Sequence, residues 1–341
     1  MKLRRPALYL AAAVAWALFP PEAGAADTLD QIKSLSSLPA LDLTKLEAGE
    51  VIGARAALGS FSRGVHAETV YFVRAPLAAV GEKLLHWDPA SHPQLEIKTL
   101  RDYRWPAGAN TWDALRFDSA RSEDRWLLDR TAQLANGQGS GELHLTAPEK
   151  EAFTGSAASQ RDKAVAEFWR KVLRGRDESI VMRGLVAAPS YTVGNIQINP
   201  HAELENLLGL APRIAAHFSG LTNTAPFAAG QPPPEELKPY WEAALVRGHT
   251  SLHAAFTAAK KGVQSWQVAD CTYYTSDTYF FSITFYELVA QPHGTLVWQI
   301  DFASAPFRSF TGGIDRVVAG NQMLKETARS ARLFRSDVGK R

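Results

Sequence analysis

The architecture of this chain is set by residues 266–303, which are WQVADCTYYTSDTYFFSITFYELVAQPHGTLVWQIDFA. Runs rich in Val, Ile, Tyr, Phe, Trp and Thr favour β structure, and they extend back to about residue 240. Breaks of the kind found in hairpins separate them at residues 247–249, 260–262, 276–277 and 291–294. The pattern predicts five antiparallel strands joined by short connections, a β-meander.

The connections also predict which side chains share a face, because side chains alternate along a strand. A loop over residues 291–294 pairs Ala290 with Thr295, and a two-residue loop at residues 276–277 pairs Thr275 with Thr278. With these registers one face is nearly all apolar, including Trp266, Phe281, Trp298 and Phe302. The opposite face is mixed and includes Gln267, Ser282 and Gln299. Such asymmetry is typical of a sheet that is covered on one side.

One long helix is predicted to follow, from Thr311 to Phe334. Apolar residues recur in it close to the helical period, at Ile314, Val317, Val318, Leu324, Ala328 and Ala331. This helix is expected to cover the apolar face of the meander, which gives a two-layer α+β fold.

The remaining chain has two further parts. Residues 155–230 are predicted to be a helical insertion, with amphipathic stretches at residues 157–174 and 202–218. The first stretch places Phe168 and Trp169 beside Arg170 and Lys171. Two interpretations stay open for it: packing on the core, or transient contact with a membrane surface.

Residues 1–25 have the features of a signal peptide. Lys2, Arg4 and Arg5 precede an apolar run over residues 7–19, and residues 23–25 match an A-x-A cleavage signal. No Cys follows the apolar run, so there is no site for a lipid anchor of the lipoprotein type. The sequence predicts a periplasmic or secreted protein whose residues 26–341 form a single domain.

Charge and cysteine content exclude several classes of protein. The chain has 37 basic and 35 acidic residues, and beyond residue 25 the numbers are equal. A neutral chain is a poor nucleic-acid binder, since such proteins need a basic face. Cys271 is the single cysteine, which excludes an intramolecular disulfide and a four-cysteine zinc site. No nucleotide-binding or hydrolase signature occurs, and no cofactor is predicted.

Two segments resemble the START-like, or SRPBCC, superfamily with its helix-grip fold. Residues 68–76 (ETVYFVRAP) look like its first strand, and residues 77–89 (LAAVGEKLLHWDP) look like the helix that follows. The last strand, residues 296–302, and the helix from Ile314 resemble the closing strand and helix of that family. The resemblance implies a cavity between the sheet and the long helix that holds a lipid, a sterol or another apolar ligand. It does not decide the function, because some members are enzymes.

Asp270 is the strongest candidate for a functional residue, because it lies on the predicted apolar face of the meander. A carboxylate there must be paired, hydrogen-bonded or protonated. Two functional roles are open, an anchor for a ligand hydroxyl or amine and a general base. The structural alternative is a buried acid satisfied by Arg308, by Arg316 or by a backbone cap. Four aromatic residues are predicted to line the pocket with it, or else to be core: Trp266, Tyr274, Tyr279 and Trp298.

Other candidates are weaker. His249 and His253 are four residues apart, but on a strand that separation is about 13 Å, too far for a shared metal ion. Cys271 is predicted to be a packing residue rather than a nucleophile.

Three functions remain open. The first is an exported protein that binds an apolar small molecule between sheet and helix. The second is a START-like exported enzyme, cyclase- or hydrolase-like, that uses Asp270. The third is a structural envelope protein whose core is filled by its own side chains.

Overall fold

The computed structural model describes residues 25–38, 41–138, 141–307 and 313–339. The apolar run of the predicted signal peptide and Arg308 lie outside these ranges. Within them the chain is a mixed α+β structure with a large antiparallel sheet and a long C-terminal helix, as predicted.

Eight strands form the main sheet in the order β1-β2-β10-β9-β8-β7-β6-β3, with every neighbouring pair antiparallel. The five predicted strands are β6 to β10, adjacent in the sheet as a meander should be. Strands β4 and β5 pair separately as a small hairpin. The bounds are β1 (Val51–Arg55), β2 (Gly64–Val73), β3 (Ile97–Asp102), β4 (Tyr191–Val193), β5 (Ile196–Ile198), β6 (Glu236–Val246), β7 (His249–Lys261), β8 (Ser265–Thr275), β9 (Phe281–Gln291) and β10 (Gly294–Ser304).

Helices fill most of the remaining described chain, including the predicted helical stretch near residues 155–230. The α-helices are α1 (Ala25–Leu35), α2 (Leu43–Glu47), α3 (Leu77–Leu85), α4 (Ser122–Gln133), α5 (Ala147–Glu151), α6 (Arg161–Arg183), α7 (Pro200–Leu208), α8 (Pro212–His217), α9 (Ser219–Thr222) and α10 (Ile314–Gly339). The short 3-10 helices are η1 (Pro89–Ser91), η2 (Pro93–Leu95), η3 (Leu134–Asn136), η4 (Ala158–Gln160) and η5 (Leu185–Ala187).

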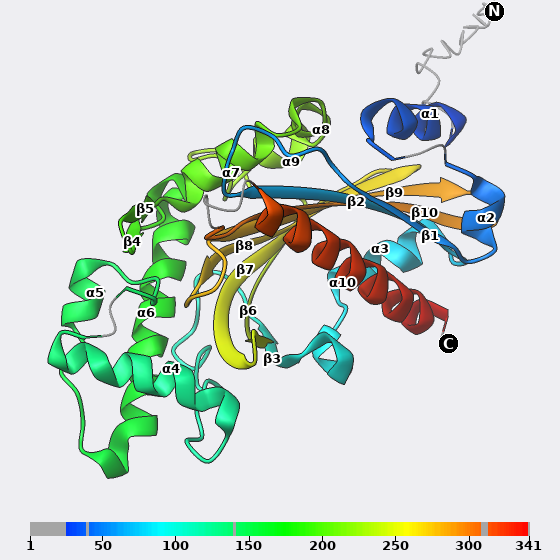
Figure 1. Ribbon diagram of the computed structural model, residues 1–341. Helices are drawn as coiled ribbons and strands as arrows, with labels where there is room; N and C mark the ends of the chain where they lie inside the picture. Colours follow the sequence, from blue (N-terminus) through cyan, green and yellow to red (C-terminus); the bar gives the residue numbers. More distant parts are fainter. Residues whose placement is uncertain (1–24, 39–40, 139–140, 308–312, 340–341) are drawn as a thin grey trace, which may run out of the picture.

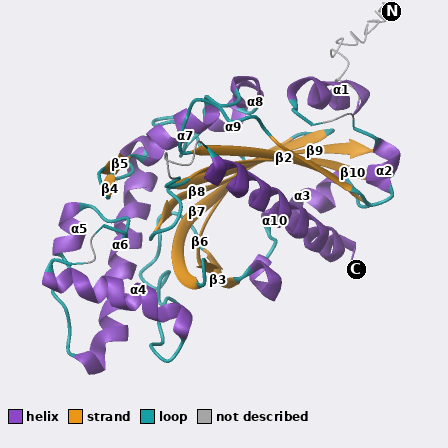
Figure 2. Cartoon of the chain, viewed as in Figure 1, coloured by secondary structure: helices purple, strands orange, loops and turns teal. Residues whose placement is uncertain are grey.

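The sheet curves around α10 and is covered on both sides, which makes three layers instead of the predicted two (Figures 1 and 2). We call the face that contacts α10 and α3 the inner face; Val268, Leu288 and Val297 pack there. The outer face contacts α1, α7 and α9 and the end of α8, where Phe218 stacks on Phe285 at 4.6 Å. Because both faces are covered, strand β2 is buried along its whole length.

The register of the meander is confirmed in one connection and wrong in another. Ala290 pairs with Thr295 as predicted. Strand β8 ends at Thr275 and β9 begins only at Phe281, so the predicted pairing of Thr275 with Thr278 does not form; Thr272 pairs with Ser282 instead. That register differs from the predicted one by a single residue, which exchanges the two faces of β9 and β10 relative to β8.

The faces are therefore mixed in a way that the alternation did not predict. Trp266 shares the inner face with Ser282 and Gln299, whereas Phe281, Trp298 and Phe302 lie on the outer face with Gln267. The polar side chains of β9 and β10 consequently face α10. Apart from Leu288 and Val297, the large apolar ones face the helices of the N-terminal region and of the insertion.

Helix α10 also presents a different side from the predicted one. Ile314 and Val318 are 64% and 61% exposed. The buried positions form a helical stripe of Arg316, Gly320, Thr327, Ala331 and Phe334. Only Ala331 and Phe334 in this stripe have apolar side chains. Helix α6 buries Phe168 and Trp169 against the core, which favours the packing interpretation of that helix.

Candidate functional site

A cavity of about 700 Å³ lies between the inner face and α10. Its apolar wall comes mainly from α3, the following 3-10 turns and β3, with Leu84, Leu85, Trp87, Leu95, Ile97 and Leu100. Strands β6 to β10 contribute mostly polar side chains, and α10 contributes Gln322, Glu326, Thr327 and Ser330. The volume falls in the range of small-molecule sites, which combine apolar walls with a few polar groups.

Asp270 lines this cavity from the middle of β8. Its carboxylate accepts a hydrogen bond from the Tyr240 hydroxyl at 2.7 Å and a longer one from Thr257 at 3.5 Å. Burial raises the pKa of Asp270 to about 6, although both hydroxyls favour the charged form. The predicted partner Arg316 is elsewhere, since its guanidinium donates to the backbone carbonyls of Gly59 and Gly64.

A row of polar side chains crosses the inner face on neighbouring strands. Thr257, Asp270, Thr284 and Asp301 are successive cross-strand partners on β7, β8, β9 and β10. Asp301 accepts hydrogen bonds from Thr284 at 2.9 Å and from Gln299 at 3.0 Å, and α10 adds Thr327 at 3.1 Å. Burial raises the pKa of Asp301 too, although its three hydrogen-bond donors favour the charged form. Asp301 holds α10 on the sheet, whereas Asp270 opens onto the cavity.

The Tyr286 side chain is a second polar group of the cavity whose hydroxyl is available for a hydrogen bond to a ligand. It lines the cavity from β9, and its hydroxyl makes no hydrogen bond to any residue that the structure describes. Burial holds the pKa of Tyr286 well above its usual value, so the group is a neutral phenol. It can donate one hydrogen bond and accept from a ligand.

Lys238 is the cation nearest to Asp270 along the row, as the cross-strand partner of Thr257. Its ammonium group binds Asp102 at 2.7 Å and the carbonyl oxygen of Leu85 at 2.7 Å. These contacts hold it at the side of the cavity, where it fastens the end of α3 to strand β6.

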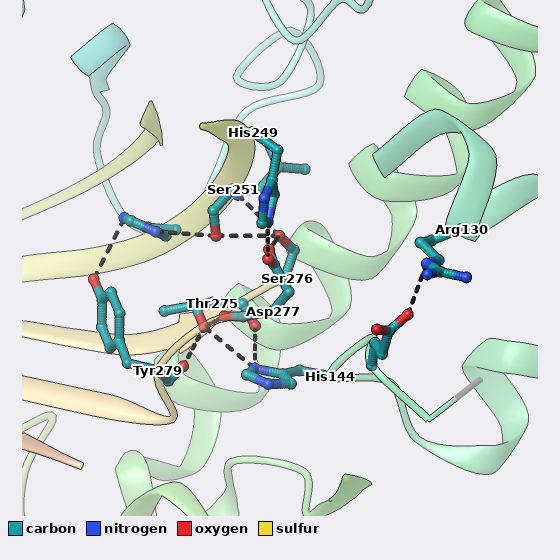
Figure 3. A network of polar contacts seen from close by, with 11 residues as sticks. Arg130, His144, His249, Ser251, Thr275, Ser276, Asp277 and Tyr279 are labelled. Carbon is teal, nitrogen blue, oxygen red and sulfur yellow. Dashed lines mark hydrogen bonds and ion pairs between the residues drawn. The ribbon is translucent and has the colours of Figure 1, made fainter. Parts of the chain in front are cut away.

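A chain of buried polar contacts runs from the cavity wall into the ends of β7 and β8, and Figure 3 shows its part from Ser251 to His249. Glu242 lines the cavity and contacts His253 Nδ1 at 2.7 Å, and His253 Nε2 contacts Ser251 Oγ at 3.2 Å. Ser251 in turn lies 3.4 Å from the hydroxyl of Ser276.

The same chain of contacts ends near the surface. Ser276 donates to Asp277 at 2.7 Å, and Asp277 contacts His249 Nε2 at 2.5 Å. Burial of Asp277 opposes its ionisation, but the hydrogen bonds from His249 and Ser276 prevail and lower its pKa. The two histidines thus have separate carboxylate partners, and no group of three His, Cys, Asp or Glu in the described ranges could hold a metal ion.

Ser251, His253 and Glu242 have the order of a nucleophile, a base and an orienting acid. Ser251, however, has no exposed surface and does not line the cavity. A substrate in the cavity would meet Glu242 and not the serine. Ser251 therefore lacks the access to the cavity that a nucleophilic serine there would need.

The structure separates the five predicted site residues. Asp270 lines the cavity, and Trp266 lies on the same face but packs on Gly81 of α3. Tyr279 does not line the cavity, and its hydroxyl lies 3.4 Å from His253 Nδ1 (Figure 3). The prediction that all five share one face is wrong for Tyr274 and Trp298.

Tyr274 and Trp298 lie on the outer face, for two different reasons. A bulge between β7 and β8 turns Tyr274 outward, where Arg176 lies 4.4 Å from its ring centre. The register of β9 and β10 turns Trp298 outward, where its indole nitrogen donates to Glu68 at 3.0 Å. Cys271 is a buried outer-face residue, and burial raises the pKa of its thiol well above the usual value.

Most of the polar groups that line the cavity could not be assigned to it from the sequence, namely Tyr240, Glu242, Thr257, Tyr286 and Gln299. Their alternation along the strands was visible, but the incorrect register between β8 and β9 assigned Gln299 to the face away from the helix. No family model, curated protein or solved structure matches this chain. In the described part of the chain, no helix has the length and apolar content needed to span a membrane.

Proposed function

We propose that this protein binds an apolar small molecule in the cavity between the inner face and α10. The observation that carries the proposal is the cavity itself, about 700 Å³ with an apolar wall opposite the half-buried Asp270. A protein whose core is filled by its own side chains would leave no such space. The proposal extends to the helix-grip architecture of START-like proteins, which the long helix within the curve of an antiparallel sheet supports.

We further propose that the protein acts outside the cytoplasm. The support is the charged segment, apolar run and cleavage signal in residues 1–25. An exported binding protein would hold or carry a poorly soluble molecule in the aqueous compartment.

The test uses a substitution that fills the cavity. Ser330 lines the cavity on α10, whereas Asn321 is exposed on the same helix. The wild-type protein, Ser330→Trp and Asn321→Trp are each incubated with a total lipid extract, and bound molecules are identified by native mass spectrometry. We expect a bound apolar molecule in wild type and Asn321→Trp, and its loss in Ser330→Trp. Equal binding by both variants, or none by the wild type, would contradict the proposal.

The raised pKa of Asp270 supports a second candidate, an enzyme in which this residue is a general acid or base. A bound molecule that is recovered chemically unchanged after long incubation favours binding. A product that wild type forms and Asp270→Asn does not form favours the enzyme.

A further inference from the structure

Asp270 is a carboxylate without a cation. Its partners are the hydroxyls of Tyr240 and Thr257, and it forms no ion pair with the residues that the structure describes. A carboxylate removed from bulk water is stabilised most by a positive charge that also donates hydrogen bonds. The protein itself does not supply one at this position.

The cations that line the same cavity are not available to Asp270. Lys238 is held by Asp102 and by the carbonyl oxygen of Leu85, both at 2.7 Å. Arg247 is exposed, in the turn between β6 and β7. The charge of Asp270 is therefore left for whatever occupies the cavity.

The neighbouring polar groups can also receive a donor. The Tyr286 oxygen has no partner among the described residues. Gln299 uses its amide nitrogen to donate to Asp301, and its carbonyl oxygen has no partner in the described chain. An ammonium group carries up to three N–H donors, whereas a hydroxyl carries one. These acceptors suit an ammonium group better than an alcohol.

The charged side chains that line the cavity are mainly negative. Five carboxylates line the cavity against two cations, and the carboxylates are Glu96, Asp102, Glu242, Asp270 and Glu326. A cavity lined mainly by one sign of charge attracts the opposite charge and repels a carboxylate ligand. The apolar wall of Leu84, Leu85 and Trp87 still requires a hydrocarbon body.

We propose that the ligand is a cationic amphiphile, a protonated amine on an apolar body, whose ammonium group lies against Asp270. This inference rests on the proposed binding function and names the chemical class of the ligand. It assigns the amine to Asp270, the apolar body to the α3 wall, and excludes fatty acids as ligands.

The experiment compares three probes that share one alkyl chain length and differ in the head group: decylamine, decanol and decanoate. Each is used below its micelle concentration at pH 7.5. Dissociation constants are measured by titration calorimetry on the full mature chain. We expect decylamine to bind about tenfold or more tighter than decanol, since a charged hydrogen bond exceeds a neutral one by roughly that factor. Decanoate should bind most weakly.

Two substitutions test whether the preference for the amine depends on Asp270. Asp270→Asn should remove the advantage of the amine and leave decanol affinity nearly unchanged. Asp113→Asn is the matched control, because it makes the same change at an exposed carboxylate that does not line the cavity. It should preserve the preference for the amine.

The outcomes separate the two proposals. Decanol binding as tightly as decylamine to the wild type would overturn the amine assignment while the binding function stands. A preference for the amine that survives in Asp270→Asn would also overturn it. If none of the three probes binds and the lipid extract yields no bound molecule, the binding function itself fails.

Discussion

Asp270 combines a position on the cavity wall with a cost to the folded state. Burial raises its pKa to about 6, from an ordinary value near 3.8, so the folded protein holds this proton more strongly than the unfolded chain does. For an acid whose pKa is raised by folding, stability falls as pH rises from about 4 to about 6 and then levels off. Residues kept at a cost to stability are common at binding sites.

Asp270→Asn should therefore stabilise the protein at pH 8. Asn keeps a carbonyl oxygen that accepts from Tyr240 and removes the charge. We expect a gain of about 1–2 kcal/mol in the free energy of unfolding, less than the full pKa difference implies because the cavity admits water. Urea unfolding of both proteins at pH 4 and pH 8 measures it. The gain should vanish at pH 4, and a variant that is less stable than wild type at pH 8 would contradict the assignment.

Tyr274 tests the corrected placement of the aromatic residues. Its hydroxyl donates to the His144 carbonyl at 2.8 Å in the outer core. Tyr274→Phe removes that buried hydrogen bond, and we expect a loss of about 1 kcal/mol in stability. Decylamine affinity should not change, because Tyr274 is remote from the cavity. Weaker ligand binding with unchanged stability would return Tyr274 to the binding site.

At the scale of elements, the connection between β8 and β9 determines which side chains reach the cavity. Residues 276 and 277 look like a two-residue turn, but their side chains bind neighbouring strands: Ser276 accepts from the Leu252 amide at 3.0 Å, and Asp277 binds His249. The chain then continues to Phe281 before it pairs again. Side-chain contacts of this kind cannot be inferred from the turn residues themselves.

Helix α10 faces the sheet with a stripe that hydrophobic periodicity does not reveal. Phe334 is 2% exposed and packs edge-on against Trp87 with 5.5 Å between ring centres. Thr327 and Gly320 occupy the same stripe, because one binds Asp301 and the other leaves room for Arg55. A helix that borders a polar cavity does not need a continuous apolar face.

Two substitutions in α10 distinguish the predicted face from the observed one. Phe334→Ala should destabilise the protein by about 3–5 kcal/mol, since it empties a buried aromatic site. Val318→Ala should change stability by no more than about 0.5 kcal/mol, because that side chain is 61% exposed. Thermal and urea unfolding of both variants measure the difference. A larger cost for Val318→Ala than for Phe334→Ala would restore the face predicted from periodicity.

For the whole molecule, the signal segment leads to a prediction about the mature chain. If residues 1–25 direct export and are removed, the protein recovered from the periplasm or medium should begin at or near Ala26. N-terminal sequencing or intact-mass measurement of that fraction tests this. Recovery there of a soluble chain that begins at Met1 would contradict it.

The sequence alone determined the mixed α+β class, the five adjacent strands of the meander and the long C-terminal helix. These features depend on local composition and on periodicity within single segments, which a sequence displays directly. The tertiary structure decided which face of each strand meets α10. A one-residue register difference and a bulge reverse side chains without any change in the composition of a strand.

The cavity therefore belongs to the tertiary structure. Its polar lining is assembled from Tyr240, Glu242, Thr257, Asp270 and Tyr286, which lie on four strands and become neighbours only through cross-strand pairing. Its apolar wall comes from α3 and β3, far earlier in the chain. Sequence patterns identified the carboxylate, but the groups that surround it depend on long-range packing, which determines both the cavity and the charge that it can accept.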